Sequence, residues 1–139
     1  MIKAKVIDII GRWSLISYST ENLDGQSITI TERQIGSLEY TVDGKVELAI
    51  DRDPEMLAEL RVDPSAAKIF YSGHFEVDDE SQQVKHFVEI SNIQDRVGTV
   101  LNRTFELKNG RLIVRGQGLR ASVILEWART KQQKGHGPL

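Results

Sequence analysis

Apolar and polar residues alternate with a period of two along most of the chain, between short turn signals. This pattern is typical of half-buried antiparallel strands, because successive side chains of a strand point to opposite faces. The Asp-Gly pair at 43–44 and the Asn-Gly pair at 109–110 are residue types of tight hairpin turns, and each separates two alternating segments. The alternation therefore predicts about eight strands, with a further edge strand at 26–31. The eight are residues 12–20, 36–42, 45–50, 69–78, 84–91, 98–108, 111–116 and 122–129.

Two parts of the chain break this alternation. Residues 2–10 predict a short amphipathic helical turn. Asp53 followed by Pro54 is typical of the N-cap and first position of a helix, which we expect over 53–60, and the Asp-Pro pair at 63–64 repeats the signal. We therefore expect one helical insertion within an otherwise all-β chain.

The organisation is that of a single domain. The chain has 139 residues, which suits one domain over 1–130, and the polar, Gly- and Pro-bearing segment 131–139 is expected to be a flexible tail. Short antiparallel strands of this kind form either a closed barrel or a two-sheet sandwich. Closure into a barrel is favoured because it removes both sheet edges.

Composition excludes several classes of function. The formal net charge is −2, so nothing attracts nucleic acid or an anionic membrane in general, and we expect neither as a partner. The chain has no cysteine, and its three histidines lack metal-binding spacing, so we expect no metal and no cofactor. The N-terminal residues do not form a signal peptide, so a cytoplasmic location is expected.

Two polar residues fall on the strand faces that are expected to point inward. His86 and Arg103 each have apolar residues two positions to either side. Because an unpaired buried charge costs several kcal/mol, Arg103 is expected to face a wet cavity, backbone carbonyls, or an anionic or carbonyl-bearing ligand. Both residues also fit a purely structural role. The expected interior lining is Ser17, Tyr40, Tyr71, Phe75, His86, Arg103 and Phe105.

Several motifs follow one another along the chain. They are a Gly-x-Trp ending at Trp13, the segments GSLEYTVDGKV, YSGHFEVDDESQQVKHFVE and GTVLNRTFELKNGRLIV, and a closing Trp-Ala-Arg ending at Arg129. In this order, these motifs resemble those of the bacterial lipocalin-like domains. The resemblance implies a calycin-type, eight-stranded up-and-down barrel around a small-molecule cavity, with Trp13 and Arg129 packed together at the barrel floor. The segment 51–67 departs from the short hairpins of secreted lipocalins, and we expect it to act as a lid.

Three functions stay open at this point. The first is binding of a small hydrophobic or amphipathic molecule, mostly apolar with a polar or anionic end. The second is a cofactor-free isomerase, cyclase or dehydratase acting on a polyketide-like intermediate, in which His86 moves a proton and Arg103 holds a developing oxyanion. The third is an interaction domain whose barrel is filled by side chains. Apolar residues on the outer face, Ile16 and Tyr18, add a homodimer as an option.

Overall fold

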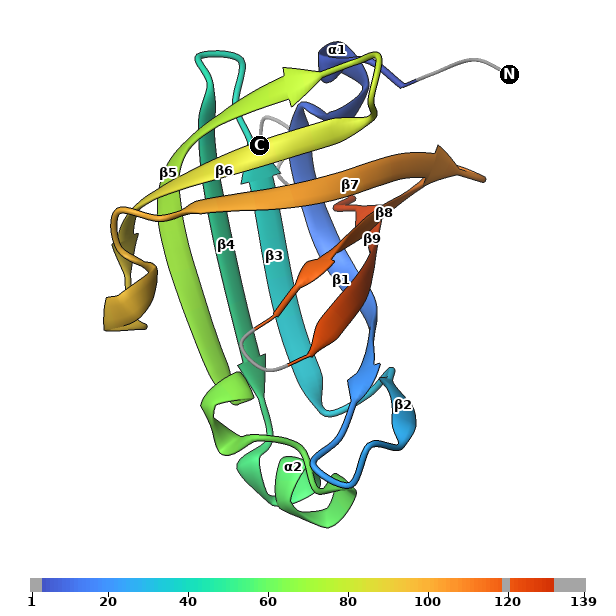
Figure 1. The fold of residues 1–139 in the computed structure, drawn as a ribbon. Helices are drawn as coiled ribbons and strands as arrows, with labels where there is room; N and C mark the ends of the chain where they lie inside the picture. The colour runs from blue at the N-terminus through green and yellow to red at the C-terminus, as the bar shows by residue number, and fades with distance from the viewer. Residues whose placement is uncertain (1–3, 119–120, 132–139) are drawn as a thin grey trace, which may run out of the picture.

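A single antiparallel sheet closes on itself in the computed structural model, which describes residues 4–118 and 121–131 (Figure 1). The expected tail lies almost wholly outside these residues. The strands are β1 Gly11–Glu21, β2 Ser27–Ile30, β3 Gln34–Tyr40, β4 Lys45–Arg52, β5 Lys68–Asp78, β6 Gln83–Ser91, β7 Val100–Lys108, β8 Arg111–Gln117 and β9 Ser122–Arg129. The helical segments are α1 Val6–Ile9, α2 Pro54–Leu60, and the 3₁₀ turns η1 Pro64–Ala66 and η2 Gln94–Arg96.

Strand order follows the chain, and β1 closes the barrel. One end of β1 pairs with β3, and a longer stretch of β1 pairs with β9, so both edges of the sheet are joined. The eight-stranded up-and-down barrel is therefore confirmed. The extra strand predicted at 26–31 is present as β2, which pairs only with the far end of β1.

Two irregularities change which side chains point inward. The pairing of β1 with β9 shifts between Leu15 and Ser17, which leaves Ile16 as an extra residue and exchanges the two faces beyond it. Tyr18 is consequently buried inside, with 8% of its surface exposed, and Ser17 turns to the outer face. The predicted inward position of Ser17 is wrong. Tyr18 also cannot contribute to the outer apolar surface that suggested a homodimer.

The second irregularity lies between β5 and β6, where the pairing shifts between Ser72 and Gly73. The backbones approach closely here, because a Cβ at Gly73 would lie 1.8 Å from the carbonyl oxygen of Phe87. Ile90, which follows the shift, is 62% exposed, although the alternation predicts it inside. A bulge thus ends the inward series of β6 at Val88.

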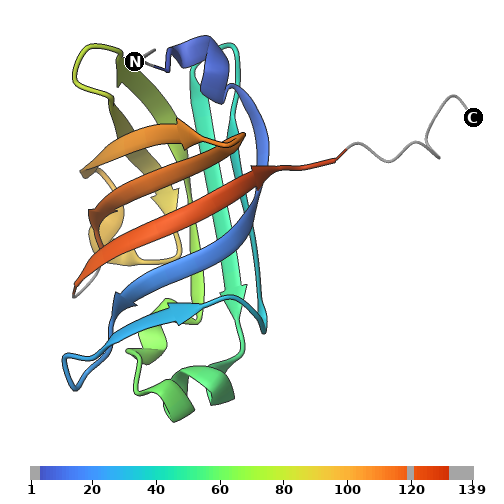
Figure 2. The ribbon, with the colours of Figure 1, turned by 90° about the vertical axis from the view of Figure 1, so that its right-hand side faces the viewer.

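α1 lies at one end of the barrel (Figure 2). The indole nitrogen of Trp13 donates to the carbonyl of Ile9, and the Arg129 guanidinium lies 4.1 Å from the centre of the Trp13 ring. Arg129 also donates to the carbonyls of Asp8 and Ile10, which ties α1 to β9. This cation–π pair therefore fastens the N-terminal segment across the barrel end.

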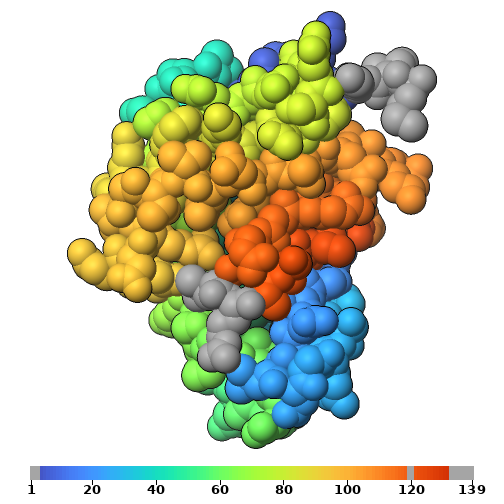
Figure 3. Space-filling view, in the orientation of Figure 1, coloured from blue at the N-terminus to red at the C-terminus, as the bar shows by residue number. Residues whose placement is uncertain are grey.

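The α2–η1 segment, residues 53–67, crosses the opposite end, beside the loop between β1 and β2 (Figures 1 and 3). Asp53 caps α2 by accepting from the amide of Glu55, as predicted. The amide of Leu23 donates to the carbonyl of Arg61 at 2.8 Å, and Arg61 forms an ion pair with Asp24. The α2–η1 segment is thus joined to the neighbouring loop. Within residues 4–118 and 121–131, no helix is long and apolar enough to cross a membrane.

Candidate functional site

A cavity of about 290 Å³ occupies the half of the barrel that faces the α2–η1 segment. Its wall is mainly aliphatic, with one indole ring, and comes from strands of the whole barrel and from the α2–η1 segment. The apolar lining residues are Leu23, Leu38, Leu48, Ile50, Val62, Ala66, Ile69, Val114, Ala121, Val123, Leu125 and Trp127. A mainly apolar cavity of this kind suits a small organic molecule better than an ion.

The residues predicted to lie inside divide into two groups. Tyr71, His86 and Arg103 line the cavity. Tyr40, Phe75 and Phe105 are buried but lie outside the lining, in the packed half of the barrel beside α1. Tyr40 meets Phe75 edge to face, with ring centres 4.8 Å apart. Ser17 is not part of the lining, because of the bulge in β1.

Tyr40, His86 and Tyr71 form a hydrogen-bonded chain across β3, β6 and β5. The Tyr40 hydroxyl lies 2.7 Å from Nε2 of His86, and the Tyr71 hydroxyl lies 2.6 Å from Nδ1. Burial, with a smaller contribution from the charge of Arg103, lowers the pKa of His86 to about 3. His86 is therefore a neutral imidazole at physiological pH, and both of its ring nitrogens are engaged.

Burial acts in the opposite direction on the two tyrosines. It raises the pKa of the Tyr71 hydroxyl to about 12 and that of the Tyr40 hydroxyl well above its ordinary value. The charge of Arg103 lowers both pKa values by a smaller amount. Both hydroxyls consequently stay protonated, and the three hydrogen-bonded side chains together carry no charge.

Arg103 reaches the cavity from β7 and is 8% exposed. Its Nη1 donates to the carbonyl of Gln117 at 3.1 Å. The side chain passes over Gly116, where a Cβ would lie 2.4 Å from Cδ of Arg103, so the missing side chain on β8 makes room for it. Among the described residues no carboxylate pairs with Arg103. The carbonyl of Gln117 is thus the acceptor that its guanidinium contacts among the described residues.

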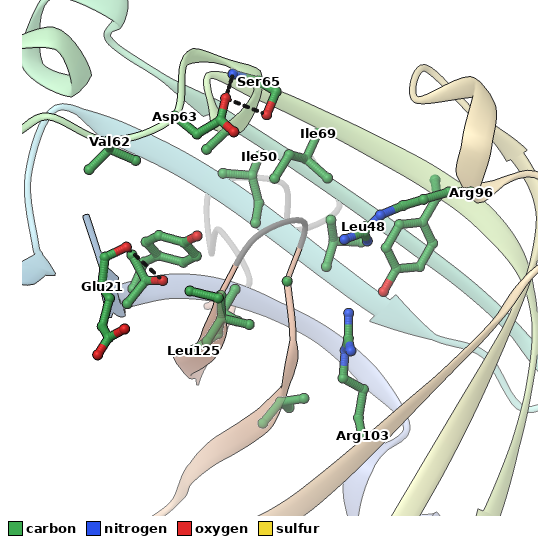
Figure 4. A pocket seen from close by; sticks show the side chains of 18 of the residues that line it. Glu21, Leu48, Ile50, Val62, Asp63, Ser65, Ile69, Arg96, Arg103 and Leu125 are labelled. Atoms are coloured by element: carbon green, nitrogen blue, oxygen red, sulfur yellow. Dashed lines mark hydrogen bonds between the residues drawn. The ribbon is translucent and has the colours of Figure 1, made fainter. Parts of the chain in front are cut away.

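Arg96 is a second guanidinium in the lining that the strand pattern does not predict. It lies at the end of η2, in the loop between β6 and β7, and Figure 4 shows its side chain and that of Arg103 directed toward the same part of the cavity, beside Leu48. Partial burial lowers the pKa of Arg96, and the like charge of Arg103 lowers it further. Within the described parts of the chain, the Arg96 guanidinium has neither a hydrogen-bond acceptor nor an ion-pair partner. The two cations therefore repel each other across one end of the cavity.

Comparison with known proteins identifies the family. Residues 10–130 match the family described as a lipocalin-like domain. The chain belongs to this family. The resemblance to lipocalin-like domains, based on the Gly-x-Trp and closing Trp-Ala-Arg motifs, is thereby confirmed.

The chain is also similar in fold to a solved structure at low sequence identity. One solved structure similar to this lipocalin-like chain is a variant of the fluorescent protein UnaG, with 13% sequence identity and a TM-score of 0.42. The alignment covers 92% of this chain and 100% of that one. No curated protein matches the chain. Within residues 4–118 and 121–131, no three His, Asp or Glu side chains gather as a metal-ligand group.

Proposed function

We propose that this lipocalin-like barrel binds a small, mostly apolar molecule and holds its polar or anionic end against Arg103. The observation that carries the proposal is the cavity, whose aliphatic wall is interrupted on one side by Tyr71, His86 and Arg103. A few convergent polar groups in an apolar pocket orient a ligand while the rest of the wall supplies affinity. At about 30 Å³ per water-sized group, the cavity has room for roughly ten non-hydrogen atoms.

The hydrogen bonds of His86 favour binding over proton-transfer catalysis. A general base needs a free lone pair within reach of the substrate, and both ring nitrogens of His86 already meet tyrosine hydroxyls. The series of hydrogen bonds also ends at Tyr40, whose hydroxyl has no further partner among the described residues that could resupply a proton. An isomerase or cyclase working through His86 and Arg103 is therefore less well supported than a binding protein. The cavity likewise argues against a filled barrel.

The two tryptophans of the chain supply a direct test. Trp127 lines the cavity, whereas Trp13 lies outside the lining and donates to Ile9. Titration with octanoate and with 1-octanol, each roughly the size of the cavity, should shift the indole N–H signal of Trp127 in ¹⁵N NMR spectra and leave that of Trp13 in place. The spectrum of Trp127→Phe assigns the two signals.

A cavity-filling variant provides the control. Val114 lines the cavity from β8, and Val114→Phe should abolish the Trp127 shift by occupying the space. Its neighbour Ile113 points to the other face of β8, so Ile113→Phe should bind as the wild type does. If neither compound shifts Trp127, or if Val114→Phe binds normally, the cavity is not a binding site.

A further inference from the structure

The Tyr40–His86–Tyr71 chain has a direction, because a neutral imidazole carries one proton and has one acceptor nitrogen. Either Tyr40 donates to His86 and His86 donates to Tyr71, or all the hydrogen bonds run the other way. The two directions leave a different hydroxyl hydrogen unused, at Tyr71 in the first case and at Tyr40 in the second. The surroundings of the two hydroxyls therefore decide between them.

Tyr40 cannot use a free hydroxyl hydrogen. Its side chain is 1% exposed, it packs against Phe75, and its hydroxyl meets no acceptor among the described residues other than Nε2 of His86. A buried, unsatisfied donor costs about 1–3 kcal/mol. Tyr40 is thus the donor to Nε2, and the proton of His86 lies on Nδ1, where it is donated to the oxygen of Tyr71.

Tyr71 is then left with its hydroxyl hydrogen at the cavity. Its side chain lines the cavity, where a ligand or a water molecule can accept that hydrogen. Arg96 and Arg103 line the same cavity and are directed toward the same part of it (Figure 4). The charges of both guanidiniums lower the pKa of the Tyr71 hydroxyl. Two guanidinium groups and one hydroxyl hydrogen make this end of the cavity a cluster of donors.

The charges at this end call for an anion. Neither Arg96 nor Arg103 has a carboxylate partner in the described residues. Two lining carboxylates, Glu21 and Asp63, come from the β1–β2 and α2–η1 side, where Asp63 accepts from Ser65. A carboxylate on the ligand would relieve the repulsion between the guanidiniums and accept a hydrogen bond from Tyr71. A neutral alcohol or ketone can accept that hydrogen bond but brings no negative charge to the guanidiniums.

We propose that the ligand of this barrel carries a carboxylate held by Arg96, Arg103 and Tyr71. In the same proposal, Tyr40 is a positioning residue that makes Tyr71 a donor through His86. The inference rests on the proposed function, since it names the head group of the molecule that the cavity binds.

The first experiment compares octanoate with 1-octanol by the Trp127 indole shift. Octanoate should bind at least about tenfold more tightly, since hydrogen bonds to a charged group are the stronger ones. Arg96→Gln should remove most of that preference, because it should lower the affinity for octanoate much more than the affinity for octanol. Arg115→Gln is the matched control, because Arg115 pairs with Glu106 on the outer face of β8. Equal affinities in the wild type overturn the carboxylate while the binding function stands, whereas failure of both compounds overturns the binding function itself.

The second experiment tests the direction of the chain. The ¹⁵N shifts of the His86 ring report which nitrogen carries the proton, and the wild type should show a proton on Nδ1. Tyr40→Phe keeps the ring and removes the donor to Nε2, so it should lower octanoate affinity several-fold and spare octanol, whose hydroxyl can donate or accept. A wild-type proton on Nε2, or a Tyr40→Phe variant with the full preference for octanoate, overturns the role of Tyr40.

Discussion

Acid should destabilise this protein at a pH well above the range in which carboxylates titrate, because His86 must remain neutral in the folded state. Its pKa is lowered to about 3, first by burial and then by the charge of Arg103, and its nitrogens face the hydroxyls of Tyr40 and Tyr71. In the unfolded chain the imidazole is free and takes up a proton near the ordinary histidine pKa of 6.5. Between these two values the unfolded state binds one proton more than the folded state, so stability is present above pH 6.5 and is lost as the pH falls.

The size of the effect follows from the difference between the two pKa values. Each pH unit in this window costs about 1.4 kcal/mol per proton. Between about pH 7 and about pH 4.5 the folded state should therefore lose about 2.5 kcal/mol through His86 alone. The carboxyls whose pKa is lowered, Asp43 and Asp53, contribute mainly below this window, because an aspartate in the unfolded chain titrates near 3.8.

Urea unfolding of the wild type and of His86→Gln, at several fixed pH values, measures this contribution. Glutamine retains polar atoms at the site and does not titrate, so the stability advantage of the wild type should shrink by about 2.5 kcal/mol over the window. The control is His74→Gln, on the outer face of β5, which keeps His86 and should keep the steep slope of the wild type. If the difference in free energy of unfolding between the wild type and His86→Gln is the same at every pH, His86 is not a buried neutral group. The hydrogen bonds of His86 with Tyr40 and Tyr71 would then be refuted as well.

Two glycine substitutions test the close contact between the β5 and β6 backbones and the packing of the Arg103 side chain against β8. Gly73→Ala places a Cβ 1.8 Å from the carbonyl oxygen of Phe87, so the strands must part, and urea unfolding should show a loss of more than about 2 kcal/mol; a loss within error would contradict the close approach. Gly116→Ala places a Cβ 2.4 Å from Cδ and Nη1 of Arg103, a side chain that can move. It should weaken octanoate binding about threefold or more in the Trp127 assay while costing less stability than Gly73→Ala, and unchanged octanoate affinity would place Arg103 outside the head-group contact.

The strands can be predicted because alternation and turn residues are local signals, but the bulges cannot. The extra residues are Ile16 in β1 and Glu89 in β6, and nothing in these two residue types marks a register shift. One extra residue exchanges the faces of everything beyond it, which is why the alternation predicts Ser17 inside and Tyr18 outside. The error therefore lies in the long-range pairing with β9 and not in the local pattern.

The same distinction explains which residues of the site the sequence predicts. His86 and Arg103 can be placed inside because each lies on a regular part of its strand, before any bulge intervenes. Arg96 cannot, because it lies in the turn η2, where the period of two no longer holds. The Tyr40–His86–Tyr71 chain joins three strands, so its hydrogen bonds depend on the register of all three.

The distribution of side-chain size along the barrel also sets how a ligand must lie. Large rings fill the half beside α1, whereas aliphatic side chains leave the cavity in the half beside the α2–η1 segment. In Figure 4, Arg96 and Arg103 lie on one side of that cavity and Val62 lies on the other. A carboxylate drawn to the guanidiniums therefore directs the apolar end of its ligand toward Val62 and the α2–η1 segment. Ligands longer than octanoate should consequently perturb the amide signals of the α2–η1 segment and not those of α1, which lies beyond the packed half.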